Sequence, residues 1–166
     1  MPLELHIGFD GQDAITRQYN AAIIRQASQA GLTAAVIQAE TEMVDAATRI
    51  VYSRPEGSRK RTGAYRASLG GGQGHIREIR EGFARVGTNI FYAHFLEEGT
   101  KAHTIRPRSA KVLKFRGRGG KMVYAREVHH PGTPALHVLG TALSQGGPRI
   151  NRAFTTAFMA RIERAI

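Results

Sequence analysis

The chain has 166 residues and no cysteine, and its formal net charge at neutral pH is +11. That length favours one domain, residues 1–166, with a core of its own, and the missing cysteine excludes disulfides and thiolate chemistry. Residues 1–9 lack the pattern of a signal peptide, and no window approaches the ~18 consecutive apolar residues of a membrane span, so we expect no membrane partner.

The N-terminal third is predicted to form one strand and two helices. Residues 3–9 alternate apolar and polar side chains, as a strand does. Asp13 is then expected to cap a helix whose apolar residues recur at four-residue spacing, and Gly31 is expected to end that helix. A second helix is predicted over residues 33–52.

The pattern of side chains in this second helix predicts one buried side. That side is expected to contain Val36, Ile37, Met43, Val44, Ala47, Ile50 and Val51. Three acids are expected on or near the opposite face: Glu40, Glu42 and Asp45. The proline, the glycine and the three consecutive basic residues of the segment 55–61 then indicate a polar surface loop.

The middle of the chain is predicted to be a glycine-rich turn followed by extended segments. Four glycines within residues 69–74 exclude the interior of a regular element. Apolar positions in residues 76–86 indicate two extended segments with a turn near residues 81–82. Residues 90–98 are compatible with a short helix or a strand, and Gly99 ends this element.

Residues 110–128 have the pattern of a β-hairpin with a glycine-rich loop. One strand is expected to contain Val112, Leu113 and Phe115. The other is expected to contain Met122, Val123, Tyr124 and Val128. A turn at residues 130–132 follows.

The C-terminal part is predicted to form a short helix and a longer one. The short helix is expected over residues 134–143, with a break at residues 146–147, and Pro148 is expected in the first turn of the last helix. This last helix has an apolar stripe, which must dock on a sheet or on a neighbouring subunit. The stripe consists of Ile150, Phe154, Phe158 and Ile162. The predicted fold class is therefore α+β, with a mostly antiparallel sheet flanked by N-terminal and C-terminal helices and a protruding basic hairpin.

The excess positive charge is confined to the last 66 residues. Residues 1–100 have eleven basic and eleven acidic side chains, whereas residues 101–166 have thirteen basic and two acidic ones. Eight of the basic residues lie within 21 positions that contain no acid: Arg106, Arg108, Lys111, Lys114, Arg116, Arg118, Lys121 and Arg126. Such a segment can contact phosphates without reading sequence, or it can dock on an acidic protein surface.

The sequence contains no coherent set of catalytic residues. The adjacent Glu97 and Glu98 point in different directions, although His94 is near, so they are poor partners for acid–base catalysis. Neither glycine-rich segment has the pattern of a phosphate-binding loop. Four histidines are the candidates for a metal site, but they lack the usual spacing: His103, His129, His130 and His137. We therefore expect no enzyme activity, no cofactor and no metal.

Three segments, in order, resemble a known family. Residues 61–69 are similar to the pattern TG-x-L-x-x-S-I after a long helix, with Tyr65 where Leu is common. Residues 86–100 are similar to VGT followed by YA-x-x-x-E-x-GT. Residues 105–143 are similar to I-x-P, L-x-F, HPGT and a final P-x-L-x-x-AL, with His137-Val138 where Pro-Phe is common.

These patterns resemble the neck or tail-completion family of long-tailed bacteriophages, also described as minor tail components or head–tail joining proteins. The resemblance implies a structural virion protein, assembled in the host cytoplasm, that forms a homo-oligomeric ring, usually a hexamer, around the DNA channel. The implied partners are head-closure or connector proteins and a tail terminator or tail tube, with non-specific proximity to genomic DNA. The residues that carry the family patterns are Thr62, Gly63, Ser68, Tyr92, Glu97, Gly99, Thr100, Pro107, His130, Pro131, Gly132 and Thr133.

The resemblance also gives these residues expected roles. Thr62-Gly63 and Gly99-Thr100 are expected to form turns that position the sheet. Glu97 is expected to cap backbone groups or to pair with a basic residue such as Arg106. The basic segment is expected to line the channel or to reach a neighbouring ring. Two other classes remain as alternatives: a small basic nucleic-acid-binding protein, and a metal-dependent enzyme built around the histidines.

Overall fold

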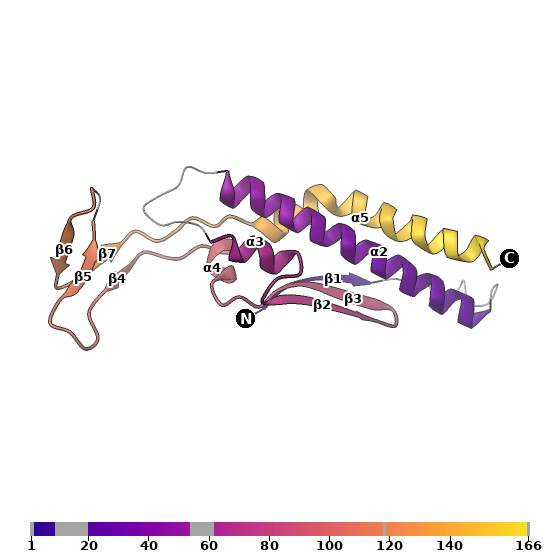
Figure 1. Ribbon diagram of the computed structural model, residues 1–166, viewed down its shortest axis with the longest axis horizontal. Coiled ribbons are helices and arrows are strands. Elements are labelled where there is room, and N and C mark those ends of the chain that lie inside the picture. Colours follow the sequence, from indigo (N-terminus) through magenta and orange to yellow (C-terminus); the bar gives the residue numbers. More distant parts are fainter. Residues whose placement is uncertain (1, 9–19, 54–61, 118, 166) are drawn as a thin grey trace.

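The computed structural model describes residues 2–8, 20–53, 62–117 and 119–165. The molecule is elongated and has two unequal parts (Figure 1). We call residues 101–132 the arm, because they project from one end, and the other described residues the body. The body has three layers, in which a long helix lies between a second long helix and a small sheet.

The sheet of the body has three antiparallel strands in the order β1-β3-β2. They are β1 (Leu3–Gly8), β2 (His75–Arg80) and β3 (Phe83–Thr88). Val86 in the central strand pairs with Leu5 on one side and with Arg77 on the other. The predicted strand at the N-terminus, the two extended segments and the turn between them are confirmed.

The central layer is α2 (Ala21–Ala47), which continues as a π-helical turn, η1 (Thr48–Tyr52). The prediction of two helices separated at Gly31 is wrong. Gly31 lies inside α2, where an added Cβ would be 2.8 Å from ring atoms of Phe154, so the glycine permits close packing. Asn20 caps α2 by accepting a 2.8 Å hydrogen bond from the Ala22 N–H, whereas the expected cap, Asp13, lies outside the described residues.

The outer layer is α5 (Val138–Glu163), which packs along α2. The predicted break at residues 146–147 is wrong, and Pro148 lies inside the helix. An added Cβ at Gly146 would be 2.4 Å from Cγ of Glu42, so this glycine also permits helix contact. The predicted stripe is buried at Ile150, Phe158 and Ile162, but it docks on α2 and not on a sheet or another subunit.

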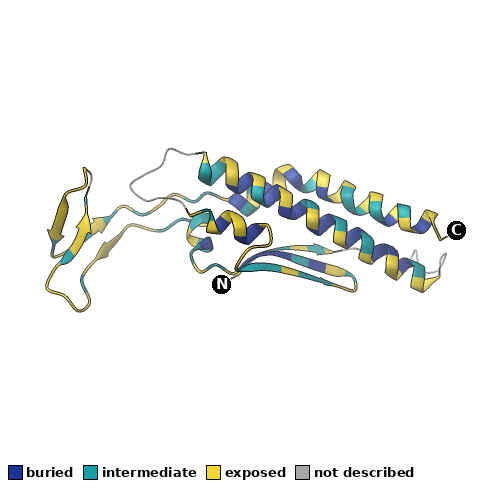
Figure 2. Cartoon of the chain, viewed as in Figure 1, coloured by how far each residue is buried: buried dark blue, intermediate teal, exposed yellow. Residues whose placement is uncertain are grey.

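The position of α2 between two layers explains why two glutamates that were predicted to be exposed are buried. Glu40 and Glu42 were predicted on or near the exposed face, but they are only 7% and 4% exposed, while Ile37 is 52% exposed. A helix in a middle layer has two buried sides, and residues two apart in sequence point to opposite sides. Glu40 therefore faces the sheet and Glu42 faces α5, and Figure 2 shows buried residues along the length of α2.

Two short helices lie before and after the β2–β3 pair in the chain, and the second leads from the sheet to the arm. They are α3 (Ala64–Leu69) and α4 (Ala93–Glu97), and the second confirms the helical alternative for residues 90–98. The glycine-rich residues 70–74 form no helix or strand beyond α3, as predicted. The predicted polar loop at residues 55–61 lies outside the described residues.

The arm contains two small antiparallel sheets of two strands each. In one, β4 (His103–Ile105) pairs with β7 (Val128–His130), and in the other, β5 (Leu113–Arg116) pairs with β6 (Met122–Ala125). Val128 was predicted in the strand that pairs with β5, but it belongs to β7. None of the described arm residues is buried, and Figure 2 shows them as exposed or intermediate.

The fold is α+β, with N-terminal and C-terminal helices and small antiparallel sheets. The expected arrangement, in which helices flank the sheet, is corrected in one respect. Both long helices lie on the same side of the β1-β3-β2 sheet, one above the other (Figure 1). Among the described helices, none is long and apolar enough to cross a membrane.

Candidate functional site

The base of the arm is formed by two of the recognised segments. Thr100 and Thr133 pair through two backbone hydrogen bonds, in which the N–H groups donate over 2.8 and 3.1 Å. Gly99 and Gly132 lie beside this bridge with φ angles of +73° and +89°. Added Cβ atoms would be 2.4 Å from the Thr133 oxygen and 2.2 Å from the Thr100 oxygen. Both positions therefore require glycine, for backbone conformation and for space.

Glu97 connects the arm base to the start of α5. Its carboxylate accepts hydrogen bonds from the N–H groups of Leu139 (3.0 Å) and Gly140 (3.1 Å), in the first turn of the helix. A carboxylate there satisfies free N–H groups and interacts favourably with the helix dipole. Of the two roles expected for Glu97, the structure shows the cap, and Arg106 pairs instead with Glu127.

A third contact joins α3 to β3 inside the body. The Thr88 hydroxyl donates to Ser68 Oγ over 2.8 Å and accepts from the Ile90 N–H over 3.2 Å. Ser68 in turn donates to the Tyr65 carbonyl over 2.8 Å, and both hydroxyl residues are fully buried. The role of Thr88 was missed by sequence reasoning, although its VGT segment was recognised.

The remaining motif residues lie around these contacts. Thr62 Oγ1 accepts a 3.3 Å hydrogen bond from the Ala64 N–H, and Gly63 precedes α3 with a φ of +76°. The half-buried Tyr92 packs edge-on against Phe91, with ring centres 5.4 Å apart. Two prolines have no described contact that defines a role: Pro107 and Pro131.

His130 belongs to both the arm and its base. Its Nδ1 accepts a 3.0 Å hydrogen bond from the Gly132 N–H, and its ring stacks on that of His103 at 5.1 Å. Of the other candidate metal ligands, His129 lies 3.4 Å from Glu127 and His137 immediately precedes α5. Among the described His, Asp and Glu side chains, no group of three is placed to hold a metal ion.

Most lysines and arginines among the described arm residues have no acidic partner. The only ion pair of an arm lysine or arginine among the described residues joins Arg106 to Glu127 at 3.1 Å. Lys114 lies over the Tyr124 ring at 5.8 Å from its centre. Within the described part of the chain, the arm cations that form no ion pair include Arg108, Lys111, Lys114, Arg116, Lys121 and Arg126, while Arg118 lies outside it.

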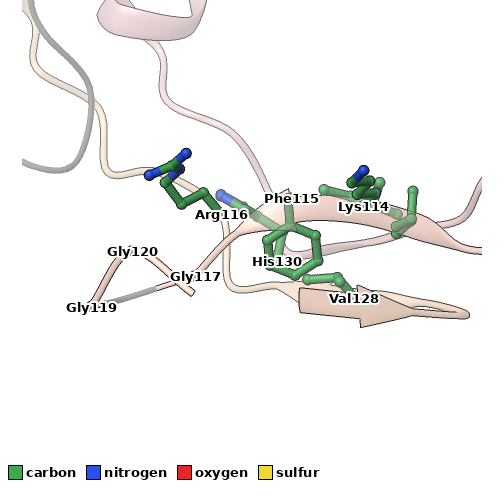
Figure 3. Close-up of a pocket in the computed structure, with 10 residues that line it drawn as sticks. Lys114, Phe115, Arg116, Gly117, Gly119, Gly120, Val128 and His130 are labelled. Carbon is green, nitrogen blue, oxygen red and sulfur yellow. The ribbon is translucent and has the colours of Figure 1, made fainter. Parts of the chain in front are cut away.

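Large apolar side chains are also exposed on the arm. They are Ile105, Val112, Phe115, Met122, Val123 and Tyr124. A groove of about 760 Å³ separates β5 from the β4–β7 sheet, and its walls include Ile105, Phe115, Val128 and His130. Figure 3 shows Phe115 and His130 at this groove, with Lys114 and Arg116 from the same strand. The arm therefore combines unpaired positive charge with exposed apolar surface.

Comparisons with known proteins were made for the whole chain. No family model, no curated protein and no solved structure matches it. The resemblance to the neck or tail-completion family rests on the sequence patterns described above and stays a prediction.

Proposed function

We propose that the chain is a structural virion protein at the head–tail junction, or neck, of a tailed bacteriophage. In this proposal it forms a ring, hexameric by resemblance, that joins the capsid connector to the tail around the DNA channel. The observation that carries the proposal is the pairing of the recognised segments at the arm base. The Thr100–Thr133 bridge and the Glu97 cap together hold the arm against the body.

This use of the motif residues favours a docking subunit over an enzyme. Glu97 is the candidate acid–base residue, and its carboxylate is occupied by two backbone N–H groups of α5. The two backbone hydrogen bonds between Thr100 and Thr133 hold the two chain segments of the arm base together. A subunit that must bridge two neighbours needs such a firmly held projection, and a hydrolytic centre does not.

In the proposal, β5 and β6 form the protruding basic hairpin. DNA that passes through a channel must slide, so strong phosphate contacts would slow its passage. The arm also exposes Phe115, Val123 and Tyr124, and contact with phosphate groups would not bury these apolar side chains favourably. At least part of the arm is therefore assigned to contacts with head-closure or tail proteins.

The body offers surface for contacts between ring subunits. Phe91, just before α4, is 78% exposed, and Phe95, within α4, is also exposed. Neighbouring exposed aromatic side chains are typical of protein interfaces. We assign this patch to the contact between adjacent subunits.

Production of particles without this protein tests the proposal. Heads and tails should then accumulate separately, and electron microscopy of complete particles should place the protein in a ring between them. Arg116→Ser combined with Lys121→Ser should reduce joining while the monomer stays folded, because both side chains are exposed. Arg152→Ser combined with Arg164→Ser removes the same charge from the body as a control. Normal joined particles without the protein would contradict the proposal.

A second candidate is a small nucleic-acid-binding protein, which the unpaired cations of the arm favour. It predicts a monomer that binds random duplex DNA with an affinity that falls steeply with salt. Weak binding at physiological salt, together with ring assembly, would exclude this candidate.

A further inference from the structure

The groove of the arm follows the edge of a strand. Its walls include the consecutive residues 113–117, and consecutive strand residues point to opposite faces. A hollow in contact with all of them therefore lies along the strand's edge and not over one face. Within the described residues, β6 pairs with one edge of β5 and no strand pairs with the other.

An unpaired strand edge presents backbone N–H and C=O groups that another extended segment can bond. In an antiparallel pair, alternate residues bond the partner and the others point outward. The outward groups of β5 are directed to the groove side. The opposite wall, which includes Ile105 and Val128, leaves a hollow of about 760 Å³, which is within the size range of ligand-binding pockets.

The side chains of β5 specify what such a segment must carry. Leu113 and Phe115 point to one face, and Lys114 and Arg116 point to the other. Side chains of paired strands lie beside one another on the same face. An added strand therefore fits best when its apolar and acidic residues alternate, with the acids beside Lys114 and Arg116.

The acids of the described chain do not supply this segment. Glu127 is the only acid of the arm and is paired with Arg106. In the body, Glu40, Glu42 and Glu78 are paired with arginines. Within the described residues, no acid forms an ion pair with Lys114 or Arg116, so both cations can accept an acidic residue of another molecule.

We infer that the arm groove is a docking site for an extended segment of a partner protein, with alternating acidic and apolar residues, which adds as a strand to the free edge of β5. Nucleic acid fits less well, because phosphates would meet the cations but leave Leu113 and Phe115 without a partner. This inference concerns the arm alone and holds whether or not the chain forms a neck ring.

The test uses the full-length protein and two labelled peptides of equal length and composition. In one, Glu and Val alternate, and in the other, all Glu residues precede all Val residues. Fluorescence anisotropy at low salt should show that the alternating peptide binds at least about tenfold more tightly, because only it matches the two faces of β5. Equal affinities would overturn the inference, since general charge attraction does not depend on the order of residues.

Variants locate the site. Arg116→Glu should weaken binding of the alternating peptide about tenfold, and Phe115→Ser should have a similar effect. Arg108→Glu is the matched control, since it makes the same charge change on the arm outside the groove, and it should change the affinity less than about twofold. Unchanged thermal unfolding of all three variants shows that the fold is kept. Equal losses in Arg116→Glu and Arg108→Glu would overturn the inference.

Two other outcomes would assign the groove to a different occupant. A single-stranded oligonucleotide that binds more tightly than the alternating peptide, and that loses affinity in both groove variants, would identify a nucleic-acid site. Self-association that Arg116→Glu abolishes and Arg108→Glu does not would identify a second copy of this chain as the occupant. Either result would replace the inferred partner segment.

Discussion

The body and the arm use charged residues in different ways. In the body, Arg77 and Arg149 each bond a carboxylate that is almost fully buried, Glu40 and Glu42. In the arm, the Arg106–Glu127 pair is exposed on both sides, and most other cations have no described ion pair. A buried carboxylate must be paired to be tolerated, whereas an exposed cation costs the fold little. The charged residues of the body thus stabilise its fold, whereas those of the arm are available to partners.

Apolar residues divide in the same way. The core of the body contains fully buried side chains from α2, α3 and β3, such as Leu32, Leu69 and Val86. The arm has no buried residue among those described, and its strands are only three or four residues long. Small two-stranded sheets are barely stable alone. The arm therefore depends on its base for position and on a partner for further burial.

The largest effect is expected from removing a core side chain of the body. Leu32→Ala should lower the free energy of unfolding by about 2–5 kcal/mol, because Leu32 is fully buried in α2 and a cavity would remain. Val123→Ala on the arm should change it by less than about 0.5 kcal/mol. Urea denaturation measures both. Similar losses would show that the arm shares the core of the body.

The next effect concerns the carboxylate between the two long helices. Arg149 donates to Glu42 over 2.5 and 2.6 Å and holds the pKa of that carboxyl below its ordinary value. Glu42→Gln should cost about 1–3 kcal/mol at neutral pH. The control Glu127→Gln, in the exposed pair of the arm, should cost less than about 1 kcal/mol.

The lowered pKa of Glu42 also determines how its contribution to the free energy of unfolding depends on pH. As the pH falls, the unfolded chain protonates Glu42 first, at about pH 4, and the folded protein does so only at lower pH. The stabilisation is therefore complete above that range and is lost as the pH falls through the folded pKa. Denaturation curves from neutral to acid pH should show the deficit of Glu42→Gln shrinking below about pH 4. A constant deficit would contradict the role of the ionised pair.

A smaller effect is expected at the arm base. Glu97→Gln keeps one acceptor for the N–H groups of α5 but loses the second acceptor and the charge, so it should cost about 1 kcal/mol. Glu98→Gln, next to it in sequence, is the matched control and should be nearly neutral. Hydrogen exchange at residues 139–141 should rise in the first variant only. Equal exchange in both would argue against the cap.

The sequence predicted local features well and the layers poorly. Strand alternation identified β1, apolar positions on both sides of a turn identified β2 and β3, and four-residue spacing identified the buried stripe of α5. Gly31 and Gly146 were interpreted as helix ends because glycine weakens a helix, but the contacts with Phe154 and Glu42 decide their role. Those contacts join residues more than a hundred positions apart, which periodicity cannot reveal.

The same limit applies to the candidate site. The motif residues were recognised as a set, yet the pairing of Gly99-Thr100 with Gly132-Thr133 follows from the fold. The groove beside β5 was also not predicted, because it depends on the place of the β4–β7 sheet. The missed signal was present in part, since the first strand of the predicted hairpin, residues 113–116, already contained alternating apolar and basic residues.

The smallest effect is expected at Tyr65, where the recognised pattern has Leu. Its side chain is 2% exposed, and burial raises the pKa of its hydroxyl, which has no hydrogen-bond partner among the described residues. Tyr65→Phe removes a polar group that the folded state leaves unsatisfied, so the free energy of unfolding should stay within about 0.5 kcal/mol or rise. Ser68→Ala, one turn along α3, is the contrasting variant, because it removes the partner of the buried Thr88 hydroxyl and should cost about 1–3 kcal/mol. A clear loss in Tyr65→Phe would mean that the hydroxyl does have a partner in solution, and that the core next to the arm base is more polar than the described contacts indicate.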